Sequence, residues 1–333
     1  MTDSMQDALA PSLVNAVLAA TGARAIDSCT GVQSLWSGYG EILRLTLSGG
    51  DRSSVILKHV KLPDQGNHPR GWNTDLSHQR KIRSYQVEAH WYQHYAHRCD
   101  QSSPVPECLA VEAGDDETLL LLTDLNSEGF DIRKDSVDIG DIHACLTWLA
   151  NFHATYLGSS TDGLWQCGTY WHLATRPDEL AALDDRKLRD AAPLIDRQLR
   201  NCQFQTLVHG DAKLANFCFS NASNHVAAVD FQYVGGGCGM KDVAYFLGSC
   251  LTENECQALE TELLDFYFSA LCNQVQSKHP RIDTDALETE WHIMFDVAWA
   301  DFHRFLKGWS PGHWKLNSYS EQLTRRVIER LQP

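Results

Sequence analysis

Three short apolar runs between residues 206 and 230, TLV, FCF and VAAV, are each separated by residues that carry side-chain oxygen or nitrogen. The first run stops at His209-Gly210-Asp211, the second begins directly after Asn216, and the third ends at Asp230. The pattern predicts strand, loop, strand, with Lys213 in the loop. If the strands pair as a hairpin, Asp211, Asn216 and Asp230 converge at one end of it.

Such a group of side chains suits magnesium-assisted phosphoryl transfer. Asn216 and Asp230 would supply oxygen ligands to Mg²⁺. Asp211 would remain to orient a substrate hydroxyl and accept its proton, as a catalytic base does. Lys213 would add positive charge where the phosphoryl group passes. The catalytic candidates are therefore Asp211 and Lys213, and the metal candidates are Asn216 and Asp230.

These residues resemble the signature of a known group of kinases. The sequence HGDAKLAN, followed by VDF at 229–231, is similar to the aminoglycoside phosphotransferase and choline kinase superfamily, and most of all to its ecdysteroid-kinase-like branch, where Asp-Phe-Gln replaces the Asp-Phe-Gly of protein kinases. The resemblance implies a bilobal, protein-kinase-like fold of the α+β class. It also implies an ATP- and Mg²⁺-dependent enzyme that phosphorylates a small-molecule hydroxyl.

The order of predicted elements agrees with two lobes. Residues 1–122 predict an N-terminal helix, an antiparallel meander, a long helix and a further hairpin, which would form the nucleotide-binding lobe. Residues 123–333 predict a mainly helical lobe with the catalytic loop and the acceptor site. The segment from 176 to 202 is predicted as helical and charged on one side.

The resemblance assigns nucleotide contacts to the first lobe. Lys58 lies inside the apolar strand SVILKHV, where an unpaired lysine is costly, and is expected to bind the α- and β-phosphates. Glu88, in the long helix, is its expected partner. The loop LWSGYG would cover the phosphates, and LLLLTDL would be the hinge that contacts adenine. The residues assigned to these two segments are Ser37, Gly38, Gly40, Thr123 and Leu125.

The C-terminal aromatic segment leaves two interpretations open. Four tryptophans and two aspartates lie in this part of the chain, at positions 291, 299, 309, 314, 296 and 301. They could bind an acceptor such as an amino alcohol, an aminoglycoside-like compound or a hydrophobic alcohol. They could equally fill the helical core. Asp242 and His153 also match family positions, and both are expected to be architectural.

Composition limits the partners and the compartment. The chain has 333 residues, with 43 acidic and 28 basic ones, for a formal net charge of -15. An acidic protein is repelled by nucleic acid and by anionic membrane surfaces, so neither is an expected partner. The 11 cysteines form no C-x-x-C pair, and the N-terminus lacks a basic signal region. These features favour a cytoplasmic protein with reduced thiols.

Two other functions are compatible with parts of the sequence. A nucleotide-binding module without catalysis would keep the same fold, although every expected polar group is present here. A nicotinamide-dependent oxidoreductase would use the GGGCG segment at 235–239, but these glycines do not form G-x-G-x-x-G.

Overall fold

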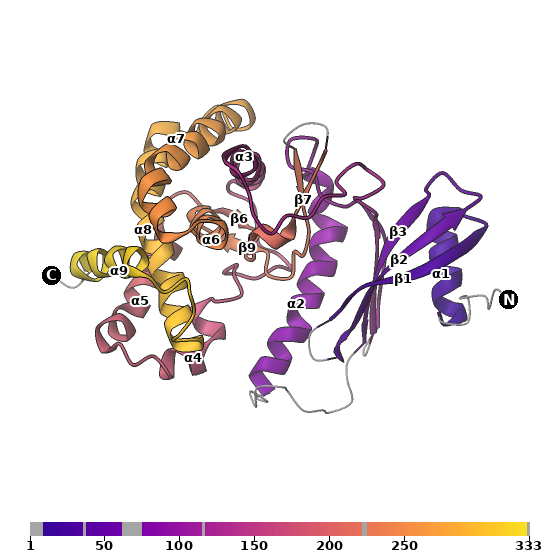
Figure 1. The fold of residues 1–333 in the computed structure, drawn as a ribbon, viewed down its shortest axis with the longest axis horizontal. Coiled ribbons are helices and arrows are strands. Elements are labelled where there is room, and N and C mark those ends of the chain that lie inside the picture. Colours follow the sequence, from indigo (N-terminus) through magenta and orange to yellow (C-terminus); the bar gives the residue numbers. More distant parts are fainter. Residues whose placement is uncertain (1–8, 36–37, 62–74, 115–116, 222–224, 332–333) are drawn as a thin grey trace.

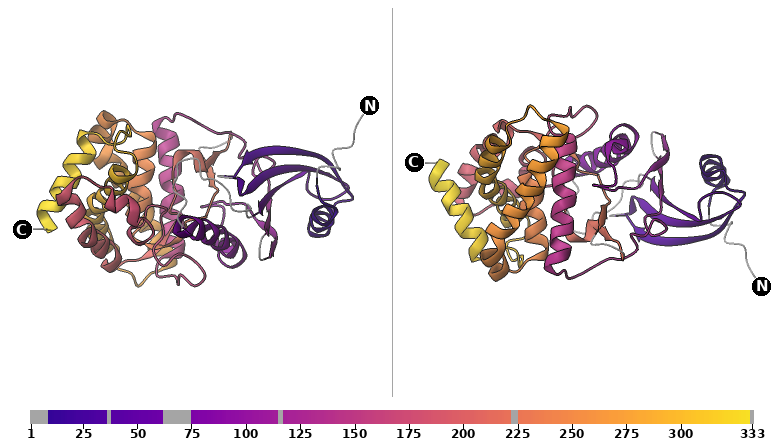
Figure 2. Two further views of the ribbon diagram at one scale, coloured as in Figure 1. Left: turned by 90° about the horizontal axis from the view of Figure 1, so that it is seen from below. Right: turned by 90° about the horizontal axis from the view of Figure 1, so that it is seen from above.

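The protein has an N-terminal sheet lobe and a C-terminal helical lobe, as the sequence predicts for this α+β fold class (Figure 1). The computed structural model describes residues 9–35, 38–61, 75–114, 117–221 and 225–331. Figure 2 shows the sheet lobe and the helical lobe on opposite sides of the molecule in both further views. The helices and strands of the first lobe are α1 (Pro11–Thr21), β1 (Ala25–Ser34), β2 (Gly40–Ser48), β3 (Ser54–Lys61), α2 (Asp75–His94), β4 (Cys108–Ala113) and β5 (Glu117–Thr123).

The sheet of the first lobe has five antiparallel strands in the order β1-β2-β3-β5-β4. The predicted meander is therefore present, and so is the predicted hairpin of β4 and β5. The first strand of this meander, β1, begins at Ala25. The predicted N-terminal helix is α1, and Gly22 closes it as a left-handed C-cap at φ 66°.

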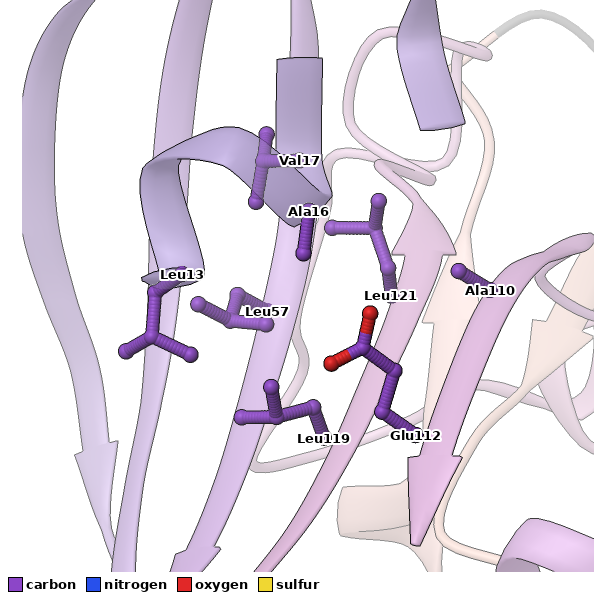
Figure 3. A pocket seen from close by; sticks show the side chains of 8 residues that line it. All are labelled: Leu13, Ala16, Val17, Leu57, Ala110, Glu112, Leu119 and Leu121. Carbon is purple, nitrogen blue, oxygen red and sulfur yellow. The ribbon is translucent and has the colours of Figure 1, made fainter. Parts of the chain in front are cut away.

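Helices cover both faces of this sheet. Leu13, Ala16 and Val17 of α1 face Leu57 and Leu121 of the sheet across a small apolar recess (Figure 3). The recess is completed by Leu119, Ala110 and Glu112. The other face of β5 packs on α2, which lies between the sheet and the helical lobe in Figure 1. A strand covered on both sides has no polar face, which explains the run of four leucines in β5.

The alternation of β3 sends Lys58 toward α2. Val55 and Leu57 belong to the core under α1. Because successive side chains of a strand point to opposite faces, Lys58 and Val60 lie on the face that α2 covers. Val60 packs there against Tyr85 of α2. The alternation of side chains along β3 therefore points Lys58, its buried charged residue, toward α2 and the second lobe.

The second lobe is built mainly from helices, and most of its buried apolar residues form one large core with α2 and the inner face of the sheet. α3 has its N-terminus closed by a capping box in which Asp138 and Asp141 each accept a backbone N–H of the other. The predicted helix of 176–202 is broken into α4 and α5, with Asp185 as N-cap of the second. The helices of this lobe are α3 (Ile139–Tyr156), α4 (Pro177–Ala181), α5 (Arg186–Asn201), α6 (Met240–Cys250), α7 (Glu253–Lys278), α8 (Thr284–Trp309) and α9 (Ser318–Leu331).

Two small antiparallel pairs hold the loop that carries the candidate site. β7 (Phe217–Phe219) pairs with β8 (Val226–Ala228), and β6 (Thr206–Val208) pairs with β9 (Gly235–Gly237). The glycines of β9 allow close packing, because a Cβ on Gly235 would lie 2.2 Å from the carbonyl oxygen of Trp165. The GGGCG segment is thus a strand pressed against a loop, which removes the structural basis for a dinucleotide-binding turn.

No helix in the described ranges is both long enough and apolar enough to cross a membrane.

Candidate active site

The predicted convergence of the two chain segments is present in the structure. Asn216 ends a single 3₁₀ turn (Leu214–Asn216) just before β7, and its Nδ2 donates to the backbone oxygen of Asp211 at 2.8 Å and to Oδ2 of Asp211 at 3.2 Å. The backbone N–H of Val229, next to Asp230, donates to the carbonyl of Asn216 at 3.0 Å. Because β7 pairs with β8, Asn216, which precedes β7, lies beside Val229 and Asp230, which follow β8.

Asp211 is a buried carboxylate with three hydrogen-bond donors around it. Lys213 Nζ lies 2.9 Å from Oδ2, and the Tyr245 hydroxyl donates to Oδ1 at 3.1 Å. Burial raises the pKa of Asp211, and the charge of Lys213 opposes that rise. Burial also opposes the charge of Lys213, but the carboxylate of Asp211 outweighs it and raises the lysine pKa. The geometry suits a carboxylate that can take up a proton.

Asp242 holds the loop that carries Asp211. Its Oδ2 accepts the backbone N–H of His209 at 2.5 Å and its Oδ1 accepts that of Gly210 at 2.9 Å. Asp242 Oδ2 also lies 3.2 Å from Nε2 of His153, and both side chains are fully buried. The predicted architectural role of these two residues agrees with these contacts. Asp242 supports the loop and does not cap α6, whose N-cap Gly239 has no side-chain partner.

His209 and Gly210 are each required by the loop geometry. The His209 Nδ1 accepts from the backbone N–H of Asp211 at 3.3 Å, so its Nε2, 3.0 Å from the carbonyl of Val229, must carry the proton. The imidazole of His209 thus ties the loop of Asp211 to the strand that leads to Asp230. Gly210 has φ 80°, and a Cβ there would lie 2.1 Å from the carbonyl oxygen of Tyr233.

Lys58 and Glu88 form the buried ion pair that the sequence predicts. The Nζ of Lys58 lies 2.6 Å from Oε2 of Glu88 and 3.7 Å from Oδ1 of Asp230. Burial disfavours the ammonium of Lys58, but the charges of Glu88 and Asp230 outweigh this effect and raise its pKa. Lys58 therefore stays charged and connects α2 with the candidate metal ligand.

Asp230 has an unusual backbone conformation and a more open side chain than Asp211. Its φ is 71°, a left-handed value that is uncommon for a residue other than glycine, and 34% of its side chain is exposed. Desolvation disfavours its charge, but neighbouring ammonium groups, Lys58 first and then Lys81, outweigh this effect and lower its pKa. The carboxylate is thus held ionised, with an exposed edge, at the end of β8.

Gln232 and Lys81 are site residues that the sequence reasoning missed. Gln232 Nε2 donates to Oδ1 of Asp230 at 2.7 Å, while its Oε1 accepts from Lys81 Nζ at 2.8 Å and from Ser84 Oγ at 3.3 Å. Burial lowers the pKa of Lys81 to about 8. The signal was available, because Lys81 stands seven residues before Glu88 and so lies on the same face of α2.

The loop between β1 and β2 contains two glycines in left-handed conformations. Gly38 has φ 77° and Gly40 has φ 119°, and a Cβ on Gly40 would lie 2.0 Å from the carbonyl oxygen of His59. Gly40 is thus required by the turn into β2. Ser37, the third residue predicted for this loop, lies outside the described residues.

The segment predicted to be the hinge, which includes Thr123 and Leu125, is hydrogen-bonded to neighbouring parts of the sheet lobe. The Thr123 N–H donates to the carbonyl of Glu107 at 3.0 Å, and the Leu125 carbonyl accepts two N–H groups of the following turn. Between them, Asp124 accepts from Arg44 Nε at 2.7 Å and from Ser54 Oγ at 2.8 Å. The Leu125 N–H has no acceptor among the residues that the structure describes. This N–H is the backbone donor of the predicted hinge that is left without a partner in the described chain.

Beside Asp211 lies an aromatic cluster, defined by Tyr170, Trp171, Tyr245, Phe302, Phe305 and Trp309. The sequence left open whether the C-terminal aromatic segment binds an acceptor or fills the helical core, and its four tryptophans differ in this respect. Trp291 and Trp299 are buried in the main core, Trp309 belongs to the aromatic cluster, and Trp314 is exposed. Both aspartates of this segment are neutralised by arginines, since Asp296 pairs with Arg330 at 3.0 Å and Asp301 with Arg304 at 2.7 Å.

The oxygen donors fit a magnesium ion that arrives with a nucleotide. Asn216 uses its amide nitrogen on Asp211, so its amide oxygen is left for a ligand, and Asp230 presents an ionised carboxylate. Among the described residues, no group of three or more His, Cys, Asp or Glu side chains could hold a metal ion. Mg²⁺ in nucleotide sites takes only one or two carboxylates and completes its shell with phosphates and water.

The sequence profile of the Ecdysteroid kinase-like family matches residues 43–158 and 169–279, which is more than half of the chain. The chain belongs to the Ecdysteroid kinase-like family. The match includes Lys58, Glu88, Asp211 and Asp230, so it covers parts of both lobes and the loop that carries Asp211. The predicted membership of this branch is confirmed. No curated protein matches the sequence.

Solved structures with the same fold have very different sequences. An amicoumacin kinase, hAmiN, in complex with AMP-PNP, Ca²⁺ and Ami, has a TM-score of 0.52 at 13% identity and covers 99% of this chain and 96% of its own. A choline kinase from Cryptosporidium parvum Iowa II has a TM-score of 0.53 at 8% identity and covers 91% of this chain and 88% of its own. At these identities the likeness establishes the shared bilobal fold.

Proposed function

We propose that this protein is an ATP- and Mg²⁺-dependent kinase that transfers the γ-phosphoryl group to the hydroxyl of a small molecule. One observation carries the proposal: a buried carboxylate, Asp211, shares a loop with Asn216, and that loop is joined to the strand end that carries the ionised Asp230. The family and the names of the two fold relatives, an amicoumacin kinase and a choline kinase, support it.

Each side chain has a separate role in this reaction. Asp211 positions the acceptor hydroxyl and takes its proton as the oxygen attacks the γ-phosphorus and ADP leaves. Lys213 neutralises charge beside the transferring group. Asn216 and Asp230 would hold Mg²⁺, which neutralises the phosphates and orients them.

The nucleotide is assigned to the side of the site that faces the first lobe. Lys58, braced by Glu88, would bind the α- and β-phosphates, with the loop of Gly38 and Gly40 above them. The adenine would pair with the free N–H of Leu125, next to Thr123. ATP and Mg²⁺ thus use the side of Asp211 that faces the sheet, and the acceptor uses the side of the aromatic cluster.

Two substitutions distinguish the proposed role of Asp211 from that of Asp230. Asp211→Asn should leave the affinity for Mg·ATP within about twofold while phosphoryl transfer to an alcohol falls by about 10² to 10⁴. Asp230→Ala should weaken Mg·ATP binding itself. Isothermal titration gives the affinities, and mass spectrometry of the acceptor gives the transfer rates. Full turnover in Asp211→Asn, or normal Mg·ATP affinity in Asp230→Ala, would contradict the assignment.

A non-catalytic nucleotide-binding module is the competing outcome of the same experiment. It would be stabilised by Mg·ATP and would transfer no phosphoryl group to any member of an alcohol panel.

A further inference from the structure

A lysine from the C-terminal segment lies against the aromatic cluster. Lys315 stands between α8 and α9, and its ammonium lies 5.2 Å from the ring centre of Tyr245 and 5.8 Å from that of Phe302. Trp314 provides a third ring at 5.5 Å. These distances are within the range of cation–π contacts. The faces of Tyr245 and Phe302 therefore already hold a cation that belongs to the protein.

This cation is close to the carboxylate that we assign to the acceptor hydroxyl. The hydroxyl of Tyr245 donates to Asp211, and the ring of the same tyrosine faces Lys315. Lys213 adds a second ammonium on the other carboxylate oxygen of Asp211. Lys213, Lys315 and the aromatic cluster thus lie on the acceptor side of Asp211.

Lys315 has unused hydrogen-bonding capacity. Among the residues that the structure describes, its ammonium makes no ion pair and donates to no acceptor. The two aspartates of the C-terminal aromatic segment could have attracted a cationic substrate. They form ion pairs with arginines instead, Asp296 with Arg330 and Asp301 with Arg304. Burial lowers the pKa of Lys315 to about 8, which still leaves its charge largely present at neutral pH.

We propose that the acceptor is a hydroxyl compound that also carries an anionic group, such as a carboxylate, and that Lys315 pairs with this group. The apolar body of the acceptor would lie on the aromatic cluster, with the hydroxyl at Asp211. This inference rests on the proposed kinase function and narrows its substrate class. It excludes the amino alcohols and aminoglycosides, because their ammonium groups would meet Lys315 where a partner carboxylate would be needed.

The test uses three probes that share a hydroxymethylbenzene body and carry different charges. They are para-(hydroxymethyl)benzoate, para-(hydroxymethyl)benzamide and para-(hydroxymethyl)benzylamine, which present an anion, a neutral group and a cation on one aromatic alcohol. The wild-type protein is assayed for phosphoryl transfer by mass spectrometry, and binding of each probe in the presence of Mg·AMP-PNP is measured by calorimetry. We expect the benzoate to bind at least tenfold more tightly than the benzylamine.

Two variants of Lys315 establish whether this lysine sets the preference. Lys315→Met should reduce the preference for the benzoate about tenfold without changing the affinity for Mg·AMP-PNP, and Lys315→Glu should reverse it toward the benzylamine. Lys278→Met removes an equal charge at the end of α7 and should leave the preference unchanged. A structural role alone would weaken all three probes together.

The outcomes separate this inference from the proposed function. Transfer to the benzylamine in preference to the benzoate would overturn the inference and keep the kinase. Equal binding of all three probes, or a benzoate preference that survives in Lys315→Glu, would also overturn it. Binding that follows the predicted order without any phosphoryl transfer would support the inference and contradict the kinase.

Discussion

The phosphate side and the acceptor side of the candidate site use charge in opposite ways. On the phosphate side, Lys58 is paired within the protein, since it contacts both Glu88 and Asp230. On the acceptor side, Lys315 faces aromatic rings and has no carboxylate partner in the described chain. A paired charge fixes geometry for a constant substrate, whereas an unpaired one is available to select a variable substrate.

The largest effect should come from breaking the buried pair on the phosphate side. Lys58→Met leaves Glu88 as an uncompensated buried carboxylate, which should cost about 3–5 kcal/mol of unfolding free energy in urea titrations. The double variant Lys58→Met with Glu88→Leu should recover most of this stability but not the affinity for Mg·ATP. Recovery of both would show that the pair is only structural.

The next largest effect should come from removing Asp242, which holds the loop of Asp211 in place for both sides of the site. Asp242→Ala removes the acceptor of two buried backbone N–H groups, at His209 and Gly210, and should cost about 3 kcal/mol of unfolding free energy. Turnover should fall as the loop of Asp211 loses its position. Asp296→Ala, which removes a more exposed carboxylate, should cost about 1 kcal/mol or less. Similar losses for the two variants would be evidence against a special role of Asp242.

A smaller effect should follow from the contacts of Gln232. Gln232→Ala removes the donor to Asp230 and the acceptor for Lys81, so the candidate metal ligand loses an orienting hydrogen bond. We expect the Mg²⁺ concentration needed for half-maximal ATP binding to rise about tenfold, with acceptor affinity unchanged. Lys81→Met should give a weaker change in the same direction. An unchanged Mg²⁺ requirement in both variants would remove Gln232 from the positioning of the metal.

The smallest effect should be a pH dependence confined to the acceptor side. Burial lowers the pKa of Lys315 to about 8, so its charge is lost as pH rises through that value, and affinity for the benzoate probe should then fall by about tenfold in total, as in Lys315→Met. The charged and titratable groups around Lys315 include Asp211, Lys213, Tyr245, Cys250 and the neighbouring His313. Lys315→Met should remove the slope, and a slope that persists in this variant would assign it to one of those groups.

Part of the candidate site could be predicted from the sequence because some of its residues break a local rule. Lys58 interrupts an apolar strand, and Asp211, Asn216 and Asp230 stand where apolar runs stop. Such conflicts between a residue and its neighbours are visible without tertiary contacts. Glu88 was predicted from the family resemblance, whereas Lys81, the lysine of α2, was not.

The acceptor side could not be predicted, because it depends on contacts between distant segments. Tyr245 and Lys315 are 70 residues apart, and nothing in the local pattern of α6 or of the segment before α9 pairs them. The break between α4 and α5 was missed for a similar reason. Asp185 looks like part of a charged helix face, but it caps α5 and pairs with Lys307 of α8 at 2.9 Å.

The central claim is that Asp211 serves transfer to a hydroxyl at a site that binds Mg·ATP independently of it. The most direct measurement follows label from γ-³²P-labelled ATP into an alcohol acceptor in wild-type protein and in Asp211→Asn, with nucleotide occupancy matched by titration. We expect label in the acceptor with the wild-type protein and a loss of at least about 10² in the variant at equal occupancy. Equal transfer by the two proteins, or label released only as inorganic phosphate by both, would contradict the claim.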